Sequence, residues 1–351
     1  MTPLPVTWGG KRIEWLDGLK GILILLVVFG HVALPVREGH PTLEAAYNIV
    51  YLFHMPLFVF MSGLLAKRSL DRTGRLRIER VLDYLLLAIA FNVVLRLIDG
   101  GGLSLGKALL MPGAPWYLAA MAIWILLTPI LAQLRPVAGL TLAVLVGVIG
   151  SMQIEATYFL GLGKALHFLP YYVLGYYATI PQVGWLRGSA LRRIICCLAG
   201  AAAAGAYLAF PDRLAFITRF MYGDTPVSIP VVPALGEYLV MTVLGLMLAV
   251  AFVAVAPAHP VVLAYLGRRT LAIYIVHRMV KGALDRAGFF DSVTTLDTLP
   301  FAVCLLGAMA VACAIALIPP LPRMLQSLTV YDWSRFRRIT ISDSAQSSPI
   351  R

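Results

Sequence analysis

Long apolar runs recur along the whole chain, separated by short segments that hold most of its charged residues. A helix needs about 20 apolar residues to cross a bilayer. Windows of roughly that length fall at 15–35, 48–66, 81–98, 116–134, 137–154, 166–181, 194–210, 235–256, 268–286 and 300–319. Because a helix satisfies its own backbone hydrogen bonds in lipid, the sequence predicts an all-α, polytopic integral membrane bundle of about ten transmembrane helices.

The composition excludes an ordinary soluble domain. Of the 351 residues, 60% are hydrophobic and 13% are charged, and the mean hydropathy is +0.84, which a soluble globular domain would not show. A net charge of +12 would suit nucleic acid, but the charges lie between the apolar runs, as membrane topology requires. The four cysteines lie in apolar segments without metal-ligand spacing. We therefore expect neither a nucleic-acid partner nor a bound metal.

The distribution of Lys and Arg predicts the orientation of the chain. Placing the N-terminus in the cytoplasm puts most of the 29 basic residues on that side, including a cluster at 67–80. Both termini are then cytoplasmic. We expect one transmembrane domain over 1–335 and a disordered cytoplasmic tail over 336–351, because that tail is polar. The first apolar run lacks a small-residue cleavage site and should be retained as the first helix.

The first run carries three ionisable side chains on one face. Asp17 and Lys20 lie near its start and His31 near its end. At about 100° per residue, Lys20 and His31 differ by about 20° around the helix, and Asp17 lies about 40° from His31. The rise between Lys20 and His31 is roughly 16 Å. Ionisable groups are costly in hydrocarbon, so this stripe should face protein or water and serve a function.

Several motifs follow from this helix. LDGLKG at 16–21 is followed, ten residues after Lys20, by His31, then by FHMPLF at 53–58 and by SG at 62–63. This set resembles the membrane-bound acyltransferase-3 family, and within it the fucose 4-O-acetylase-like, polysaccharide O-acetyltransferase branch. A basic residue, ten residues and a histidine form the signature of that family in its first helix. Here the basic residue is lysine, where arginine is common.

The resemblance implies an O-acyltransferase of the bacterial inner membrane. Its expected donor is acetyl-CoA from the cytoplasm, and its expected acceptor is a hydroxyl of a carbohydrate, such as a cell-surface or exported polysaccharide or glycoconjugate, on the far side. We expect no separate soluble catalytic domain, so the reaction would occur within the bundle or at its mouths. The sequence does not fix the acceptor sugar, the acyl group or the oligomeric state, although a homodimer is compatible with it.

Residues on the cytoplasmic side are the candidates for donor binding. Arg77 and Arg80 resemble an RxxR element that the family associates with coenzyme A, and guanidinium groups can hold phosphates bidentately. We expect Lys20 to orient the donor or its phosphates and Asp17 to fix Lys20. A contact of Ser62 with the donor is the less favoured of two interpretations, since SG also suits close helix packing.

Deeper residues are the candidates for catalysis and acceptor binding. His31 could take a proton from the attacking sugar hydroxyl, or it could be acylated itself in a two-step relay. His54 should lie at a similar depth, where it would line the site or pack beside it. Trp116 opens a WYL element like that of the family, which suits either an interfacial aromatic belt or sugar stacking. Tyr274 and His277 share a polar helical stripe with Lys281 and Asp285, and this face belongs inside the bundle. We expect Lys281 and Asp285 to form an ion pair.

Two other classes of function compete with this interpretation. A transporter or flippase for a sugar or lipid-linked substrate would show the same composition and topology, and only the motif set disfavours it. A non-catalytic partner in polysaccharide export would tolerate replacement of both Lys20 and His31. An acyltransferase consumes a thioester, whereas a transporter moves an unmodified substrate.

Overall fold

The structure is a computed structural model, and it describes residues 7–8, 11–70, 76–102, 104–152, 158–223 and 229–328. The predicted tail at 336–351 lies outside the described residues. The described chain is helical apart from a short antiparallel pair near its start, in which β1 (Thr7–Trp8) pairs with β2 (Lys11–Arg12). The fold is therefore all-α, as predicted.

Most of the predicted spans coincide with one helix. They correspond to α1 (Glu14–Ala33), α2 (Pro41–Leu65), α3 (Ile78–Ile98), α5 (Trp116–Leu131), α6 (Pro136–Ser151), α10 (Ala190–Ala209), α12 (Val231–Val255), α14 (Thr270–Arg286) and α16 (Thr298–Leu317). Shorter helices join them: η1 (Leu34–Val36), η2 (Ala66–Ser69), α4 (Leu105–Leu109), α9 (Ile180–Trp185), α11 (Ile217–Phe220), α13 (Val261–Gly267), α15 (Phe289–Val293) and α17 (Leu321–Leu328).

One predicted span, 166–181, is wrong as a single helix. The chain there forms α7 (Leu162–His167) and α8 (Leu169–Tyr177), which meet at Phe168. Pro170 lies in the first turn of α8, where its missing N–H has no intrahelical partner to lose. The break lies beside Lys164 and His167, the polar residues that interrupt this apolar run.

Six helices of the described chain are long and apolar enough to cross a membrane: α1 with η1, α2, α3, α10, α12 and α16. The helices α5 and α6 are apolar but have 16 residues each, about 24 Å in length. That length is less than the roughly 30 Å of a bilayer core. A multi-pass membrane protein is thus confirmed, whereas the count of ten spans and the location of the termini stay predictions.

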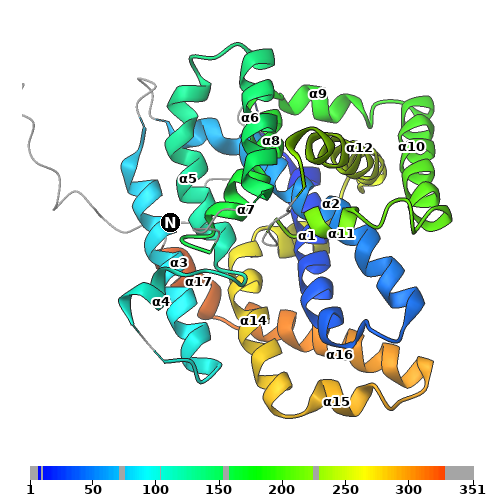
Figure 1. The fold of residues 1–351 in the computed structure, drawn as a ribbon. Helices are drawn as coiled ribbons and strands as arrows, with labels where there is room; N and C mark the ends of the chain where they lie inside the picture. Colours follow the sequence, from blue (N-terminus) through cyan, green and yellow to red (C-terminus); the bar gives the residue numbers. More distant parts are fainter. Residues whose placement is uncertain are drawn as a thin grey trace, which may run out of the picture.

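The bundle is built around α1, which passes through the middle of the molecule (Figure 1). This helix packs against α2, α13, α14 and α16. The crossing with α13 is so close that a Cβ added to Gly267 would overlap the carbonyl oxygen of Asp17, and one added to Gly21 would overlap that of Leu263. Small residues that let backbones approach in this way are the usual means of helix association in membranes.

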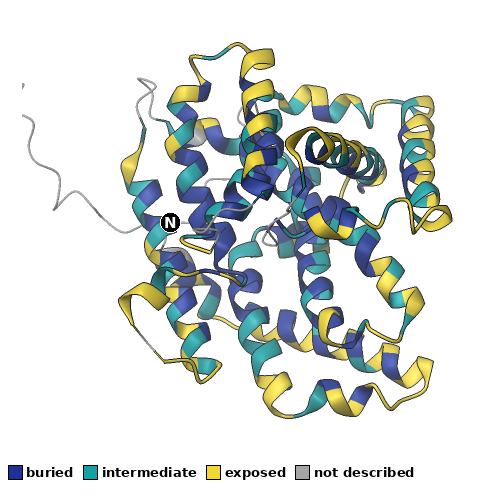
Figure 2. Ribbon diagram, in the orientation of Figure 1, coloured by how far each residue is buried: buried dark blue, intermediate teal, exposed yellow. Residues whose placement is uncertain are grey.

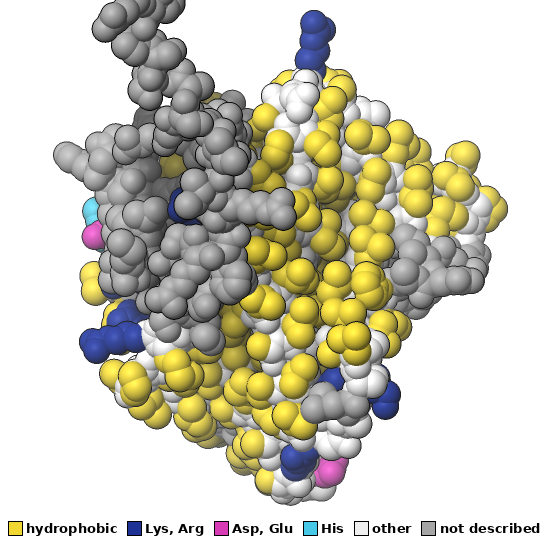
Figure 3. Space-filling model, turned by 90° about the vertical axis from the view of Figure 1, so that its left-hand side faces the viewer, with side chains coloured by type: hydrophobic (Ala, Val, Ile, Leu, Met, Phe, Trp, Pro, Cys, Tyr) yellow, Lys and Arg dark blue, Asp and Glu magenta, His cyan; other side chains and the backbone are white. Residues whose placement is uncertain are grey.

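The outside of the bundle is apolar where lipid would surround it. Figure 2 shows buried residues concentrated on the inward faces, while α10 at the edge is largely exposed. In Figure 3, hydrophobic side chains cover the middle of one face and most of the visible Lys and Arg lie toward its margins. Because soluble proteins rarely expose so large an apolar patch, this surface fits the multi-pass membrane character of the chain.

Candidate active site

The histidine of the first helix meets a second histidine inside the bundle. His31 lies in the last turn of α1 and His277 lies midway along α14, and their ring centroids are 5.1 Å apart with the planes inclined by 40°. His277 is buried, and its Nδ1 lies 2.8 Å from the carbonyl oxygen of Ile273. Because only a protonated Nδ1 can donate to that carbonyl, the Nε2 of neutral His277 carries a lone pair. That buried Nε2 has no hydrogen-bond partner in the described structure.

The histidine pair has two cationic neighbours within electrostatic range. Arg278 and Lys164 interact electrostatically with His31, as do the rings of His277 and His54. The Nε of Arg278 is buried without a hydrogen-bond partner among the described residues. Positive charge in a water-poor site attracts any negative charge that develops there. The cluster is therefore suited to a reaction that passes through an oxyanion.

His54 lies within electrostatic range of His31. It is buried on α2, its Nδ1 is 2.8 Å from the carbonyl oxygen of Val50, and its ring meets that of Tyr51 edge-on with 4.6 Å between centroids. The hydrogen bond fixes this ring in the same tautomer as His277, with Nε2 unprotonated when the ring is neutral. His54 thus borders the site with a fixed orientation.

Trp116 is placed differently from a belt residue. Its side chain is only 7% exposed and its ring stacks on Phe168 with 5.3 Å between centroids. The ammonium of Lys164 lies 5.7 Å from the Trp116 ring centroid, within the range of a cation–π contact. Through Lys164, the indole is connected to the surroundings of His31. The interpretation as an exposed interfacial anchor is wrong for this residue.

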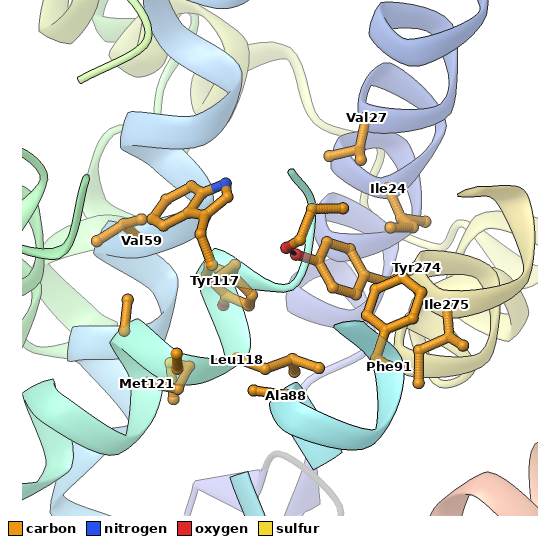
Figure 4. Close-up of a cluster of buried hydrophobic side chains, with 14 of the residues drawn as sticks. Ile24, Val27, Val59, Ala88, Phe91, Tyr117, Leu118, Met121, Tyr274 and Ile275 are labelled. Atoms are coloured by element: carbon orange, nitrogen blue, oxygen red, sulfur yellow. Dashed lines mark hydrogen bonds between the residues drawn. The ribbon is translucent and has the colours of Figure 1, made fainter. Parts of the chain in front are cut away.

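A tyrosine pair extends the site toward α2. Figure 4 shows Tyr117 of α5 and Tyr274 of α14 in a buried cluster with Phe91, and the two tyrosine ring centroids are 5.7 Å apart. The hydroxyl of Tyr274 donates to the carbonyl oxygen of Ala114. The hydroxyl of Tyr117 lies 2.6 Å from Ser62 Oγ. The contact between the two rings thus links a hydrogen bond of α14 with one that reaches α2.

Ser62 is occupied within the bundle. Besides its bond with Tyr117, its Oγ donates to the carbonyl oxygen of Phe58 at 3.0 Å. The neighbouring Gly63 packs so closely on α8 that an added Cβ would overlap the carbonyl oxygen of Tyr172. The structure therefore supports the interpretation that Ser62 and Gly63 serve helix packing. Ser62 could bind the acyl donor only by giving up its hydrogen bond with Tyr117.

Asp17 and Lys20 form the ion pair that their spacing predicts. Lys20 Nζ lies 2.7 Å from Asp17 Oδ1, and the two side chains are 21% and 1% exposed. Pairing holds the ammonium in one direction while leaving it partly accessible. Lys20 lies roughly 16 Å along α1 from His31, so this pair and the histidine pair form two separate centres on one helix.

Arg77 and Arg80 flank the start of α3. Arg77 is the exposed residue that precedes the helix, and its backbone N–H donates to the carbonyl oxygen of Ser69 at 2.9 Å. Arg80 is half-buried in the first turn and lies within electrostatic range of Tyr84. The two residues remain neighbours at one end of the bundle. No described contact connects them with Lys20.

Two members of the cluster were missed by sequence reasoning. Arg278 directly follows His277, and a cation in the middle of an apolar span is the signal that could have identified it. Lys164 lies on α7, in an apolar run interrupted by polar residues, and the sequence did not predict which helices that run forms. By contrast, the predicted pairing of Lys281 with Asp285 is confirmed at 2.8 Å. Among the described residues, no group of three or more His, Cys, Asp or Glu side chains could hold a metal ion.

Fold and site together define a multi-pass helical membrane protein with ionisable side chains buried at its centre. The model of the acyltransferase-3 family, described as an acyltransferase domain, matches residues 13–318, and the chain belongs to this family. It is also similar to the nodulation protein NolL of Sinorhizobium fredii, with 43% identity over 61 residues. That match covers 16% of this chain and only 17% of NolL. No solved structure matches the chain.

Proposed function

We propose that this acyltransferase moves an acetyl group from cytoplasmic acetyl-CoA to a hydroxyl of a carbohydrate acceptor, at the inner membrane of a bacterium. The observation that carries the proposal is the contact of His31 with His277, with Arg278 and Lys164 within electrostatic range of His31. In the proposed topology, ten spans leave both termini in the cytoplasm. The Asp17–Lys20 pair then lies at the cytoplasmic mouth and His31 lies deeper.

In the direct route, neutral His31 accepts the proton of the acceptor hydroxyl as its oxygen attacks the thioester carbonyl carbon. Arg278 and Lys164 stabilise the oxyanion of the tetrahedral intermediate. Collapse of the intermediate breaks the carbon–sulfur bond, and the leaving thiolate takes the proton from the His31 imidazolium. In the covalent route, His31 itself attacks the thioester and the acceptor then displaces it. Both routes release acetylated acceptor and free coenzyme A.

The remaining residues take binding and orienting roles in this proposal. The His277 ring packs against the His31 ring and so limits its orientation, while His54, Trp116 and Tyr274 border the acceptor. On the donor side, Lys20 with Arg77 and Arg80 attract the phosphates of coenzyme A. Ser62 would join them only after giving up its hydrogen bond to Tyr117.

The test measures release of free thiol from acetyl-CoA by the purified full chain, with a glycan extract as acceptor. Wild type should release thiol only when glycan is present, and His31→Gln should lose at least about 10²-fold, as expected for removal of a general base. His40→Gln is the matched control, because this histidine stacks on Phe301 with 4.4 Å between ring centroids instead of joining the cluster. Full activity of a folded His31→Gln protein would contradict the proposal. If folded wild type released no thiol with any of the acyl donors tried, the result would favour a transporter.

A further inference from the structure

An arginine without a charged partner follows the end of α1. Arg37 comes directly after η1, about 10 Å from His31 along the rise of the two helices, and its side chain is partly exposed. Among the described residues, no carboxylate forms an ion pair with it. The exposed Glu44 acts on it only at longer range. The positive charge of Arg37 is therefore available to a ligand.

Two tyrosines hold the guanidinium of Arg37 toward the interior of the bundle. Its Nη1 donates to the hydroxyl of Tyr222 at 2.9 Å, and its guanidinium carbon lies 4.5 Å from the centroid of the Tyr47 ring. Tyr47 is fully buried, and its hydroxyl accepts a hydrogen bond from Tyr222 at 3.2 Å. An aromatic face and a hydroxyl orient the guanidinium without neutralising it. Because it lies over a buried ring, Arg37 faces the bundle and not the surrounding lipid.

A third tyrosine connects this arginine with the histidine cluster. Tyr51 stacks on the buried tyrosine ring with 4.0 Å between centroids. It interacts electrostatically with both Arg37 and Arg278. A Cβ added to Gly30, the residue before His31, would lie 2.6 Å from the Tyr51 ring. Both cations thus lie near one tyrosine that packs against α1 directly beside His31.

We infer that Arg37 binds an anionic group of the acceptor glycan, a carboxylate or a phosphate, and so holds another position of that glycan at His31. This inference rests on the acyl transfer proposed above. Paired guanidinium N–H groups suit carboxylate and phosphate oxygens equally. The phosphates of coenzyme A are assigned to Lys20, which lies near the opposite end of α1. Since about 10 Å separates Arg37 from His31, the anion and the acetylated hydroxyl are different groups of the acceptor.

Acyl transfer to chemically altered glycan tests this assignment. The readout is the KM for glycan in thiol release by the purified full chain. The probes are the untreated extract, the extract with its carboxyl groups reduced to alcohols, and the extract with its phosphate esters removed. For wild type, one treatment should raise the KM about tenfold, the effect of losing a hydrogen bond to a charged group, and that treatment identifies the anion. Arg37→Gln should show this rise on untreated extract and no further rise after the treatment, because both changes remove one interaction.

Arg213→Gln is the matched control and should leave the KM unchanged. Arg213 is an exposed arginine whose guanidinium carbon also lies near an aromatic ring, 5.7 Å from the centroid of Phe210. Equal KM values of wild type for all three extracts would overturn the assignment, as would an equal rise for folded Arg37→Gln on untreated and treated extract. If Arg37→Gln does not fold, Arg37→Lys decides, because lysine keeps the charge but not the paired donors. An unchanged KM for that variant on untreated extract would overturn the assignment.

Glycan retention without acetyl-CoA separates this inference from the acyl transfer. The immobilised full chain is incubated with labelled, untreated glycan, and the bound fraction is measured. Wild type should retain about tenfold more glycan than Arg37→Gln. If retention depends on Arg37 but wild type releases no thiol, only the proposed acyl transfer fails. Retention that does not depend on Arg37 would contradict the inference, whatever the thiol release.

Discussion

At the scale of single residues, the surroundings of His31 explain why its chemistry would need the folded bundle. The imidazole alone is an ordinary base, but here it contacts the ring of His277 and lies near two cations that come from other helices. In a site that excludes water, each of these groups acts on the reacting atoms more strongly than it would in solvent. Arg278, with its unpartnered Nε, is the cation best placed to test this.

We expect Arg278→Gln to reduce kcat about 10²–10³-fold, the usual effect of removing one oxyanion-stabilising group, with a smaller effect on the KM for acetyl-CoA. Steady-state kinetics of thiol release would measure both constants. Arg286→Gln is the control, because Arg286 is an exposed arginine on the last turn of the same helix. If Arg278→Gln changed only the KM, Arg278 would bind a substrate and would not stabilise the transition state.

At the scale of helices, close crossings position the charged side chains. The crossing of α1 with α13 brings Gly267 onto the backbone of Asp17, the residue that pairs with Lys20. The crossing of α2 with α8 does the same beside Ser62, where Gly63 and Gly175 each lie against a carbonyl oxygen of the other helix. A side chain at these positions would push the helices apart and displace the residues that they carry.

Gly267→Ala should therefore lower stability by about 1–3 kcal/mol, the range for overpacking, and should lower the unfolding temperature in detergent. Gly236→Ala provides the control, since a Cβ at this position of α12 would meet no atom within 4 Å. There, the better helix propensity of alanine should leave stability unchanged or raise it by up to about 1 kcal/mol. Equal unfolding temperatures for the two variants would show that the α1–α13 crossing can relax.

At the scale of the whole molecule, experiment can assign each end of the helical bundle to one side of the membrane. Glu38 is exposed just after η1, and Arg135 is exposed just before α6. The segment that joins α5 to α6 lies at the opposite end of the bundle from the segment that joins α1 to α2 (Figure 1). In a variant without the native cysteines, Glu38→Cys should react with a membrane-impermeant thiol reagent. The reagent is added to cells whose outer membrane has been removed and whose cytoplasmic membrane is intact. Arg135→Cys should react only after permeabilisation, because basic segments remain in the cytoplasm. The reverse pattern would place the N-terminus outside.

The sequence by itself determined the helical class, the family and the stripe that places Asp17, Lys20 and His31 on one face. Hydrophobic length and helical periodicity are local properties, so they can be read without knowing the fold. It also predicted the ion pairs Asp17–Lys20 and Lys281–Asp285, because residues three or four apart on a helix are neighbours. Hydrophobic length also explains why nearly all of the predicted spans coincide with a helix.

Only the tertiary structure decided which distant residues meet. His277 and Arg278 lie more than 200 residues from His31 in the chain, and their contact depends on how α1 and α14 pack, which no local pattern specifies. The split of one predicted span into α7 and α8, the burial of Trp116 and the pairing of Ser62 with Tyr117 have the same origin. Each depends on side-chain fit between helices, a property that belongs to the assembled bundle and not to any segment of it.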